Sequence, residues 1–430
     1  MIYYNSPFNI VVSSSDKSST VHNLVTNTVY VFRERWNTIL DGANANKDLA
    51  NELLKRSLIV NSDDYITNVK NYFQLKDTSN KRLLFYFTLT TKCEFHCKYC
   101  FQNNIKRSDS SPEVIQQFVD WLHEYLSSFS QNFEEIFLVI FGGDPITRSD
   151  LSCLLLKFVS KICNTHNLKM RSIMTTNGTV ADTDLINKLR KNGLQTIQVS
   201  FEGPRDIHNL TRPGSYDTIL SNLIKYQNHF HLRIKYNIWK ANSDRPVFEK
   251  FLDDLEKQKI TRECIIVLES IQETTTNLGP KSGCYQYNDP LLGQIFTQFV
   301  EIGKKRGFRI SLKSAFQPPC MFTSRNSYLI DTNGDIYNCD TAFGIKNFRV
   351  GNIFKTPLIK IDKNKNREPI FNLAMRVCAK KRCPYFPICE TGCYFYRYVK
   401  NLKFNDSLCR ESYISSFFPL LTKIFQREVK

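Results

Sequence analysis

Six short apolar runs, separated by stretches with helical periodicity, occupy the middle of this chain and constrain its fold more than any other feature. They lie at 83–90, 135–141, 168–175, 195–201, 231–238 and 264–269. Between the runs, apolar residues recur at the i, i+3, i+4 spacing of amphipathic helices, for example over 112–126 and 151–162. Regular strand–helix alternation is typical of a parallel sheet with helical connections. The sequence therefore predicts an α/β fold, a partial (β/α)6 TIM-like barrel.

Two regions of different character flank this alternation. Residues 1–80 combine short apolar runs with helical stretches near 31–40 and 47–56, followed by a strand-like SLIV. This order predicts a small N-terminal α+β domain. The region 311–430 is rich in cysteine and poor in long periodic segments, so we expect a separate C-terminal domain after a barrel at 81–310.

The cysteine content indicates metal binding. The N-terminus lacks a basic stretch followed by an apolar one, and no apolar run approaches 18 residues, so we expect a soluble, cytoplasmic protein with no membrane partner. Fourteen cysteines in a reducing compartment are not expected to form disulfides, and those that cluster suggest metal ligands. Cys153, Cys163 and Cys264 lie in apolar segments and are predicted core residues, whereas Cys284 lies in a polar stretch and stays open.

The formal charge of +17 raises the question of a nucleic-acid or acidic-lipid partner. No dense basic run with interleaved aromatic residues is present. The count treats every thiol as neutral, and thiolates bound to metal would lower the positive excess. We therefore predict no nucleic-acid partner.

A cysteine triplet, Cys93, Cys97 and Cys100, directly follows the first predicted strand. In barrels of parallel strands, ligands bind at the carboxyl ends of the strands. A structural zinc ion needs a fourth ligand, and His96 is adjacent, but a loop wrapped around the three thiols should turn this histidine outward. A four-iron cluster on three thiolates keeps one iron open for a small molecule.

The stretch CEFHCKYC, with the aromatic Tyr99 before its last cysteine, resembles the signature of the radical S-adenosylmethionine (radical SAM) enzymes. The resemblance implies a [4Fe-4S] cluster on the three thiols, with S-adenosylmethionine chelating the open iron through its amino and carboxylate groups. It also implies reductive cleavage to a 5′-deoxyadenosyl radical, with the electron supplied by an external flavodoxin- or ferredoxin-type donor.

The segment FGGDPITR after the second strand resembles the Gly-Gly-Glu segment of the same family, here Gly142, Gly143 and Asp144. Glycines at a strand end allow close approach of the cofactor's ammonium group. The shorter aspartate departs from the family pattern. The next strand ends in TTNG, as in the family.

The fourth strand ends in SFEGPRDIHNLTRPG, which resembles a Ser-x-Asp-Gly-Pro…His…Arg run of the family. Ser200 and Arg212 match positions that hold the cofactor's ribose and carboxylate, and Glu202 replaces the usual aspartate. An arginine can bind a carboxylate through two hydrogen bonds. Without the resemblance, Arg212 reads as a solvated surface charge.

The spacing of the last seven clustered cysteines resembles the auxiliary-cluster domain called SPASM. The resemblance implies an outer [4Fe-4S] cluster on Cys378, Cys383, Cys389 and Cys409 and an inner one on Cys320, Cys339 and Cys393. The fourth inner position is an open iron, Ser314 or Cys284. Asp340 matches the position of a proposed base in anaerobic sulfatase-maturing enzymes; a hydrogen-bonded turn aspartate is the alternative. A Gly334 turn between two short strands is also expected.

The resemblance spans residues 83–410 and implies a radical enzyme acting on a peptide or protein. The leading hypothesis is a peptide maturase that abstracts hydrogen from a side chain of a ribosomally made precursor and forms a thioether or carbon–carbon cross-link. The alternative is a formylglycine-forming sulfatase-maturing enzyme. A non-enzymatic iron–sulfur or zinc scaffold is the third hypothesis. Residues 1–80 partly resemble leader-peptide-binding domains, which add the peptide as a strand to a sheet edge.

Overall fold

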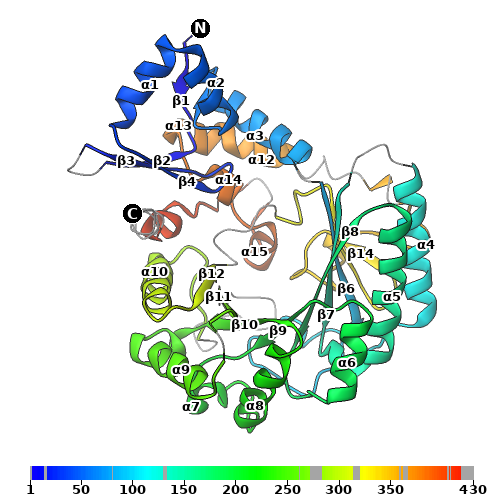
Figure 1. Ribbon diagram of the computed structural model, residues 1–430. Coiled ribbons are helices and arrows are strands. Elements are labelled where there is room, and N and C mark those ends of the chain that lie inside the picture. Colours follow the sequence, from blue (N-terminus) through cyan, green and yellow to red (C-terminus); the bar gives the residue numbers. More distant parts are fainter. Residues whose placement is uncertain are drawn as a thin grey trace.

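A ten-stranded sheet forms the centre of the protein in the computed structural model (Figure 1). The strands follow the order β12-β11-β10-β9-β8-β7-β6-β13-β14-β15. The structure describes residues 2–13, 17–79, 81–128, 133–260, 262–271, 283–312, 320–357, 360–361, 367–403, 406 and 408–417.

Seven of these strands are parallel neighbours in chain order. They are β6 (Arg82–Thr90), β7 (Glu135–Gly142), β8 (Lys169–Thr176), β9 (Thr196–Ser200), β10 (His231–Ile238), β11 (Ile265–Ser270) and β12 (Arg309–Leu312). The first six confirm the predicted strands, and the partial barrel is confirmed with them. The seventh was not predicted, because its four residues RISL are too few to show a period.

Helices cover the outer face of the parallel strands (Figure 1). They are α4 (Pro112–Ser128), α5 (Ser149–Thr165), α6 (Thr183–Lys191), α7 (Arg205–His208), α8 (Tyr216–Gln227), α9 (Arg245–Lys257) and α10 (Pro290–Lys305). Alternate residues of β6 point to them: Phe85 and Phe87 contact Phe118 of α4 with ring centroids 5.2 and 5.0 Å apart. Cys163 and Cys264 are buried in this core, and Cys153 packs against it, as predicted.

The sheet continues past the predicted boundary at 310. Strand β13 (Ser327–Ile330) pairs in parallel with β6 on the side opposite β7. Strands β14 (Asp335–Tyr337) and β15 (Arg349–Asn352) then add in antiparallel order. The expected turn between β13 and β14 is confirmed, with Gly334 at a φ of 80° that only glycine adopts freely.

The N-terminal unit contains a three-stranded antiparallel sheet of β2 (Asn9–Ser13), β3 (Ser19–Asn23) and β4 (Thr28–Phe32), with β3 in the middle. A two-residue pair joins β1 (Tyr4–Asn5) to β5 (Ile59–Val60), which confirms the SLIV strand. The helices are α1 (Trp36–Ala45), α2 (Lys47–Lys55) and α3 (Tyr65–Ser79). The helix expected from residue 31 begins later, because the β-branched TVYVF run forms β4.

The C-terminal region contains short helical segments, two of which carry a cysteine, Cys378 and Cys389. They are α12 (Glu368–Leu373), a π-helical turn (Ala374–Cys378), α13 (Ala379–Lys381), α14 (Phe386–Cys389) and α15 (Tyr394–Val399). Figure 1 shows α3 running beside α12 and α13. Among the described residues, we find no helix with the length and hydropathy needed to cross a membrane.

Candidate functional site

The cysteine triplet occupies the loop that leaves the carboxyl end of β6. Cys97 is buried, whereas Cys93 and Cys100 are partly exposed, and the Cys100 N–H donates to the Cys97 carbonyl at 2.9 Å. His96 is exposed, as the wrapped loop predicted. The pKa of Cys97 is raised to about 11, chiefly by burial, and the nearby thiols of Cys100 and Cys93 contribute to the rise. The three sulfur atoms therefore share one site.

Gly142 and Gly143 pack against the backbone that leads into this loop. The Gly143 N–H donates to the Thr90 carbonyl at 2.8 Å. A Cβ on Gly142 would lie 2.1 Å from the same oxygen, and a Cβ on Gly143 would lie 2.1 Å from the Lys92 carbonyl oxygen. The Gly142 carbonyl accepts from Gln102 Nε2 at 3.0 Å. The glycines thus let β7 approach the chain immediately before the first cysteine.

Asp144 is buried with one carboxylate oxygen engaged and one without a partner. Its Oδ1 accepts from Thr176 Oγ1 at 2.6 Å and from the Asn177 N–H at 3.3 Å. Its Oδ2 has no hydrogen-bond partner among the described residues. Burial raises the pKa of Asp144 to about 6, although both hydrogen bonds favour the charged form. A cation beside Oδ2 would stabilise that form.

Arg212 is buried, which corrects the interpretation of this residue as a surface charge. Its Nη1 lies 2.8 Å from Oε1 of Glu202, which is fully buried. Its Nη2 donates to the Tyr99 hydroxyl at 2.7 Å, and Tyr99 donates to Glu202. Burial disfavours ionised Glu202, but Arg212 and the hydrogen bonds that Glu202 accepts hold the pKa of this carboxyl below its usual range. The two charges therefore stabilise each other out of water.

Further polar groups that the sequence did not single out complete this network. Asn237 Nδ2 donates to Glu202 Oε1 at 2.6 Å, and Thr211 Oγ1 donates to Glu202 Oε2 at 2.9 Å. Asn237 is the penultimate residue of the apolar strand β10, and a polar residue near a strand's carboxyl end is the signal that could have found it. Ser200 lies at the carboxyl end of β9, paired in register with Lys235 of β10.

The two sides of the triplet offer groups that fit an amino-acid zwitterion. The unpartnered Asp144 Oδ2 is an acceptor on the side of Cys93. Burial is the largest cause that raises the pKa of the Cys93 thiol, and the charge of Asp144 raises it as well. Arg212 Nε is a buried donor without a partner among the described residues, and its charge lowers the pKa of Cys97 against the effect of burial. An ammonium suits the first and a carboxylate the second. The described residues thus fit the amino and carboxylate groups of S-adenosylmethionine.

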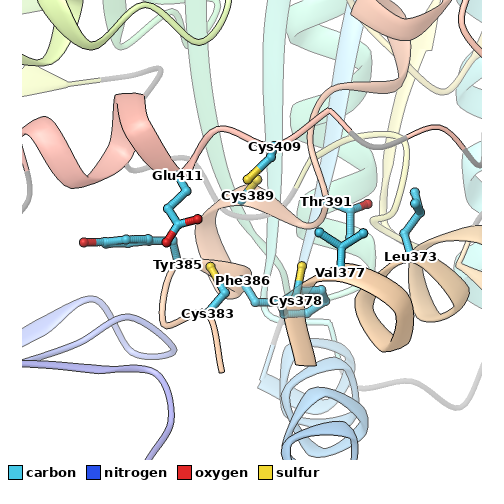
Figure 2. Close-up of a pocket in the computed structure, with 10 residues that line it drawn as sticks. All are labelled: Leu373, Val377, Cys378, Cys383, Tyr385, Phe386, Cys389, Thr391, Cys409 and Glu411. Carbon is cyan, nitrogen blue, oxygen red and sulfur yellow. The ribbon is translucent and has the colours of Figure 1, made fainter. Parts of the chain in front are cut away.

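The four predicted outer-cluster cysteines line one pocket in the C-terminal region. The pocket holds about 390 Å³ of empty space, including space open to solvent. Figure 2 shows the sulfur atoms of the four cysteines around this space, with Glu411 and Tyr385 at its side. The pKa of Cys378 is raised to about 12, chiefly by burial, and the thiols of Cys383, Cys389 and Cys409 contribute to the rise. The set implied by the SPASM resemblance therefore converges in space.

The three predicted inner-cluster cysteines form a second group. Burial raises the pKa of Cys339 well above its usual value, and Asp340, Cys393 and Cys320 add to the rise, in that order. Asp340 is partly exposed and accepts from Thr341 Oγ1 at 3.4 Å.

The fourth inner position remains a prediction. Ser314 lies outside the described residues. Cys284 is buried after Gly283, whose carbonyl accepts from the Lys240 N–H at 3.0 Å near the end of β10.

The grouping of the cysteines bears on the kind of metal. Within the described part of the chain, no three His, Cys, Asp or Glu side chains converge closely enough for a single ion. A tetrahedral zinc ion requires its ligands about 2.0–2.3 Å from one centre. A multi-iron cluster binds each thiolate through a different iron, so its ligands stand farther apart. An iron–sulfur cluster rather than a zinc ion at each group stays a prediction.

Residues 87–240 match the family model described as Radical SAM superfamily. This part of the chain therefore matches a radical SAM domain, a kind of domain that holds one [4Fe-4S] cluster and S-adenosylmethionine. Among curated relatives, the cysteine-type anaerobic sulfatase-maturating enzyme of Clostridium perfringens is 24% identical, over 78% of this chain and 94% of its own length. The Fe-coproporphyrin III synthase of Methanosarcina barkeri is 27% identical over 44% of this chain.

The chain spans only 45–46% of the length of the first two curated relatives that it matches. Two solved structures share the fold over more of it. Native anSMEcpe with bound AdoMet and Cp18Cys peptide has a TM-score of 0.62 at 18% identity, covering 81% of this chain and 98% of its own. Streptococcus suis SuiB bound to precursor peptide SuiA has a TM-score of 0.55 at 16% identity, covering 95% and 100%.

Replacing Asp144 with asparagine should weaken S-adenosylmethionine binding by about ten- to one-hundredfold, the range for losing a hydrogen bond to a charged group. The amide keeps the size of the side chain but not the charge that an ammonium needs. Equilibrium binding to the anaerobically reconstituted protein measures the effect, and iron content must match the wild type. Asp144→Glu, which restores the family's residue, is the control. Equal affinities for Asn and wild type would exclude the contact.

Proposed function

We propose that the protein is a radical SAM peptide maturase that carries three [4Fe-4S] clusters and forms a thioether or carbon–carbon cross-link in a ribosomally made precursor peptide. The observation that carries this proposal is the convergence of seven C-terminal cysteines into two groups behind a radical SAM barrel. Such auxiliary clusters suit an oxidative cross-link, because an electron must leave the substrate after hydrogen abstraction.

Each part of the chain has a task in this proposal. S-adenosylmethionine bound at the triplet supplies the radical that abstracts hydrogen from a peptide side chain. Asp144 and Arg212 orient the cofactor's amino and carboxylate groups, and the Glu202 carboxylate holds Arg212 and Tyr99 in place. Asp340, the residue after Cys339, is the proposed base that accepts a proton from the oxidised substrate carbon.

The extent of the structural matches favours a peptide maturase over a sulfatase-maturing enzyme. The anSMEcpe structures are covered almost completely, yet they leave about a fifth of this chain unmatched. SuiB, solved with its precursor peptide, matches 95% of the chain, although with a lower TM-score. The proposed task of the N-terminal unit is to hold the precursor peptide.

Anaerobic incubation with candidate precursor peptides, followed by mass spectrometry, tests the proposed reaction. A cross-link should lower the peptide mass by two hydrogen atoms. Replacing Cys93, Cys97 and Cys100 together with Ala should abolish 5′-deoxyadenosine formation. Replacing Cys378, Cys383 and Cys389 should preserve it but stop product formation. Persistent cofactor cleavage by the first triple variant would refute the assignment of the triplet.

The sulfatase-maturing alternative rests on Asp340. The variant Asp340→Asn tests the role of this residue in cross-linking and in formylglycine formation alike. Asp340→Asn should slow product formation more than 5′-deoxyadenosine formation, because a base acts only after hydrogen abstraction. Sulfur accounting in the product separates formylglycine from a cross-link, since only formylglycine formation at a cysteine loses sulfur. Equal slowing of both steps would indicate that Asp340 has a structural role.

The N-terminal sheet offers two edges for a peptide strand, β2 and β4, because β3 is central. Deleting residues 1–78 is a poor test, since α3 is buried against the C-terminal region through Tyr65 and Tyr72. Proline removes a backbone donor from a ladder. Of two consecutive N–H groups on an edge strand, one points away from the sheet.

Proline variants at consecutive positions of each edge should therefore separate peptide binding from folding. The variants are Tyr30→Pro and Val31→Pro in β4, and Val11→Pro and Val12→Pro in β2. At the edge that binds, one variant of the pair should lose at least tenfold in peptide affinity, about 1.4 kcal/mol, with little loss of stability. Fluorescence anisotropy measures the affinity. Unchanged affinity in all four folded variants would assign recognition to another part of the protein.

A further inference from the structure

A buried ion pair joins helix α3 to the short turn between Cys389 and Cys393. Lys76 Nζ lies 2.5 Å from Oε1 of Glu390, and each of the two side chains is only 7% exposed. Lys76 also donates to Thr323 Oγ1 at 3.0 Å. Buried charges occur almost only in pairs, so this lysine and glutamate fix each other across a sequence separation of 314 residues.

Hydrogen bonds engage both oxygens of the Glu390 carboxylate. The Tyr72 hydroxyl donates to Oε1 at 2.6 Å, and Thr323 Oγ1 donates to Oε2 at 2.6 Å. Tyr72 also lies 3.0 Å from the Pro387 carbonyl. Tyr72 and Lys76, which lie on one face of α3, thus both donate hydrogen bonds to the Glu390 carboxylate.

The turn that Glu390 begins has a backbone that needs external support. Glu390, Thr391 and Gly392 have φ values of 43°, 69° and 100°, all in the left-handed region. This region is unfavourable for residues other than glycine. On the other side, the fully buried Arg397 donates to the carbonyls of Thr391 and Gly392. The conformation persists because the groups around it determine it.

This turn contacts both groups of cysteines. Cys389 belongs to the predicted outer set and Cys393 to the inner set. A Cβ on Gly392 would lie 2.4 Å from the carbonyl oxygen of Leu408, the residue before Cys409. Thr323 donates its N–H to the Cys320 carbonyl at 3.0 Å. A change in the turn would therefore move ligands of both predicted clusters.

We propose that Lys76 and Tyr72 of the N-terminal unit are positioning residues for the auxiliary clusters, acting through Glu390 on the Cys389–Cys393 turn. The proposal rests on the proposed function, which supplies the clusters. Outer groups that orient metal ligands and set the local charge tune cluster stability and reduction potential. Removing Lys76 leaves a negative charge beside the thiolates, which disfavours adding an electron. The auxiliary potential should then become more negative.

The test uses the full-length protein, reconstituted anaerobically, with iron analysis and EPR-monitored redox titration. The wild type should hold about twelve irons, about eight of them auxiliary. Lys76→Met should make an auxiliary midpoint potential more negative or release auxiliary iron. Glu390→Gln should shift the potential in the opposite direction. The double variant should return toward the wild type, which identifies the coupling between the two charges.

Control variants distinguish an effect of the Lys76–Glu390 pair from general loosening of the interface. Asp63→Asn breaks the exposed Asp63–Arg382 pair, which also joins the N-terminal unit to the C-terminal region at 2.6 Å, and should change neither property. Tyr72→Phe removes only a hydroxyl and replaces Lys76→Met if that variant does not fold. The EPR response of the triplet cluster to S-adenosylmethionine is the internal reference and should stay unchanged.

Unchanged auxiliary potentials and iron content in Lys76→Met, Tyr72→Phe and Glu390→Gln would overturn the positioning role. An equal effect of Asp63→Asn would overturn it as well, because general loosening of the interface would then explain the result. A wild type that saturates at about four irons would instead refute the three-cluster function itself. The two failures are therefore distinguishable before any variant is made.

Discussion

The position of β6 between β7 and β13 is the constraint on which the rest of the structure depends. Because β6 through β12 are parallel, their carboxyl ends meet at one edge of the sheet. That edge receives the cysteine triplet from β6, the Gly-Gly-Asp segment from β7 and the Glu202 network after β9. On its other side, β6 pairs with β13, which leads into the cysteine-rich region. One strand thus joins the radical SAM domain to both predicted auxiliary groups.

The sequence predicts the parts of this arrangement that depend on local periodicity and spacing. The six strand–helix units are visible in the pattern of residues, whereas the division of seven cysteines into two groups is implied by the SPASM resemblance. The interactions that hold Arg212 are not visible, because its burial depends on Glu202 and on Asn237, which lies on another strand. A charged residue in a loop reads as solvated until its partner is known. Strand β12 is likewise too short to recognise without its neighbour β11.

Long-range pairs of opposite charge explain most of what the sequence leaves out. Lys76 and Glu390 each look like surface residues in their own segments, yet both are buried. Removing one partner of a buried ion pair lowers the free energy of unfolding by about 3–5 kcal/mol, because the other charge stays buried without a partner. Such pairs therefore determine how distant segments pack together, whereas periodicity determines only whether each segment forms a helix or a strand. The described ion pairs Lys76–Glu390 and Arg367–Asp77 both involve α3, at 2.5 and 2.6 Å.

Through these contacts, α3 connects the N-terminal unit to the cysteine-rich C-terminal region. The helix closes the N-terminal unit, where Phe8 next to β2 packs against Tyr65 at a ring distance of 5.7 Å. It also supports the turn between Cys389 and Cys393, which belong to the two predicted clusters. A peptide added to the N-terminal sheet would then be held by an element that cannot shift without disturbing a buried ion pair. In a radical enzyme this rigidity matters, because hydrogen abstraction requires the reacting atoms to be held close and in register. Under the proposed function, the same helix would set both peptide recognition and the geometry of the predicted clusters.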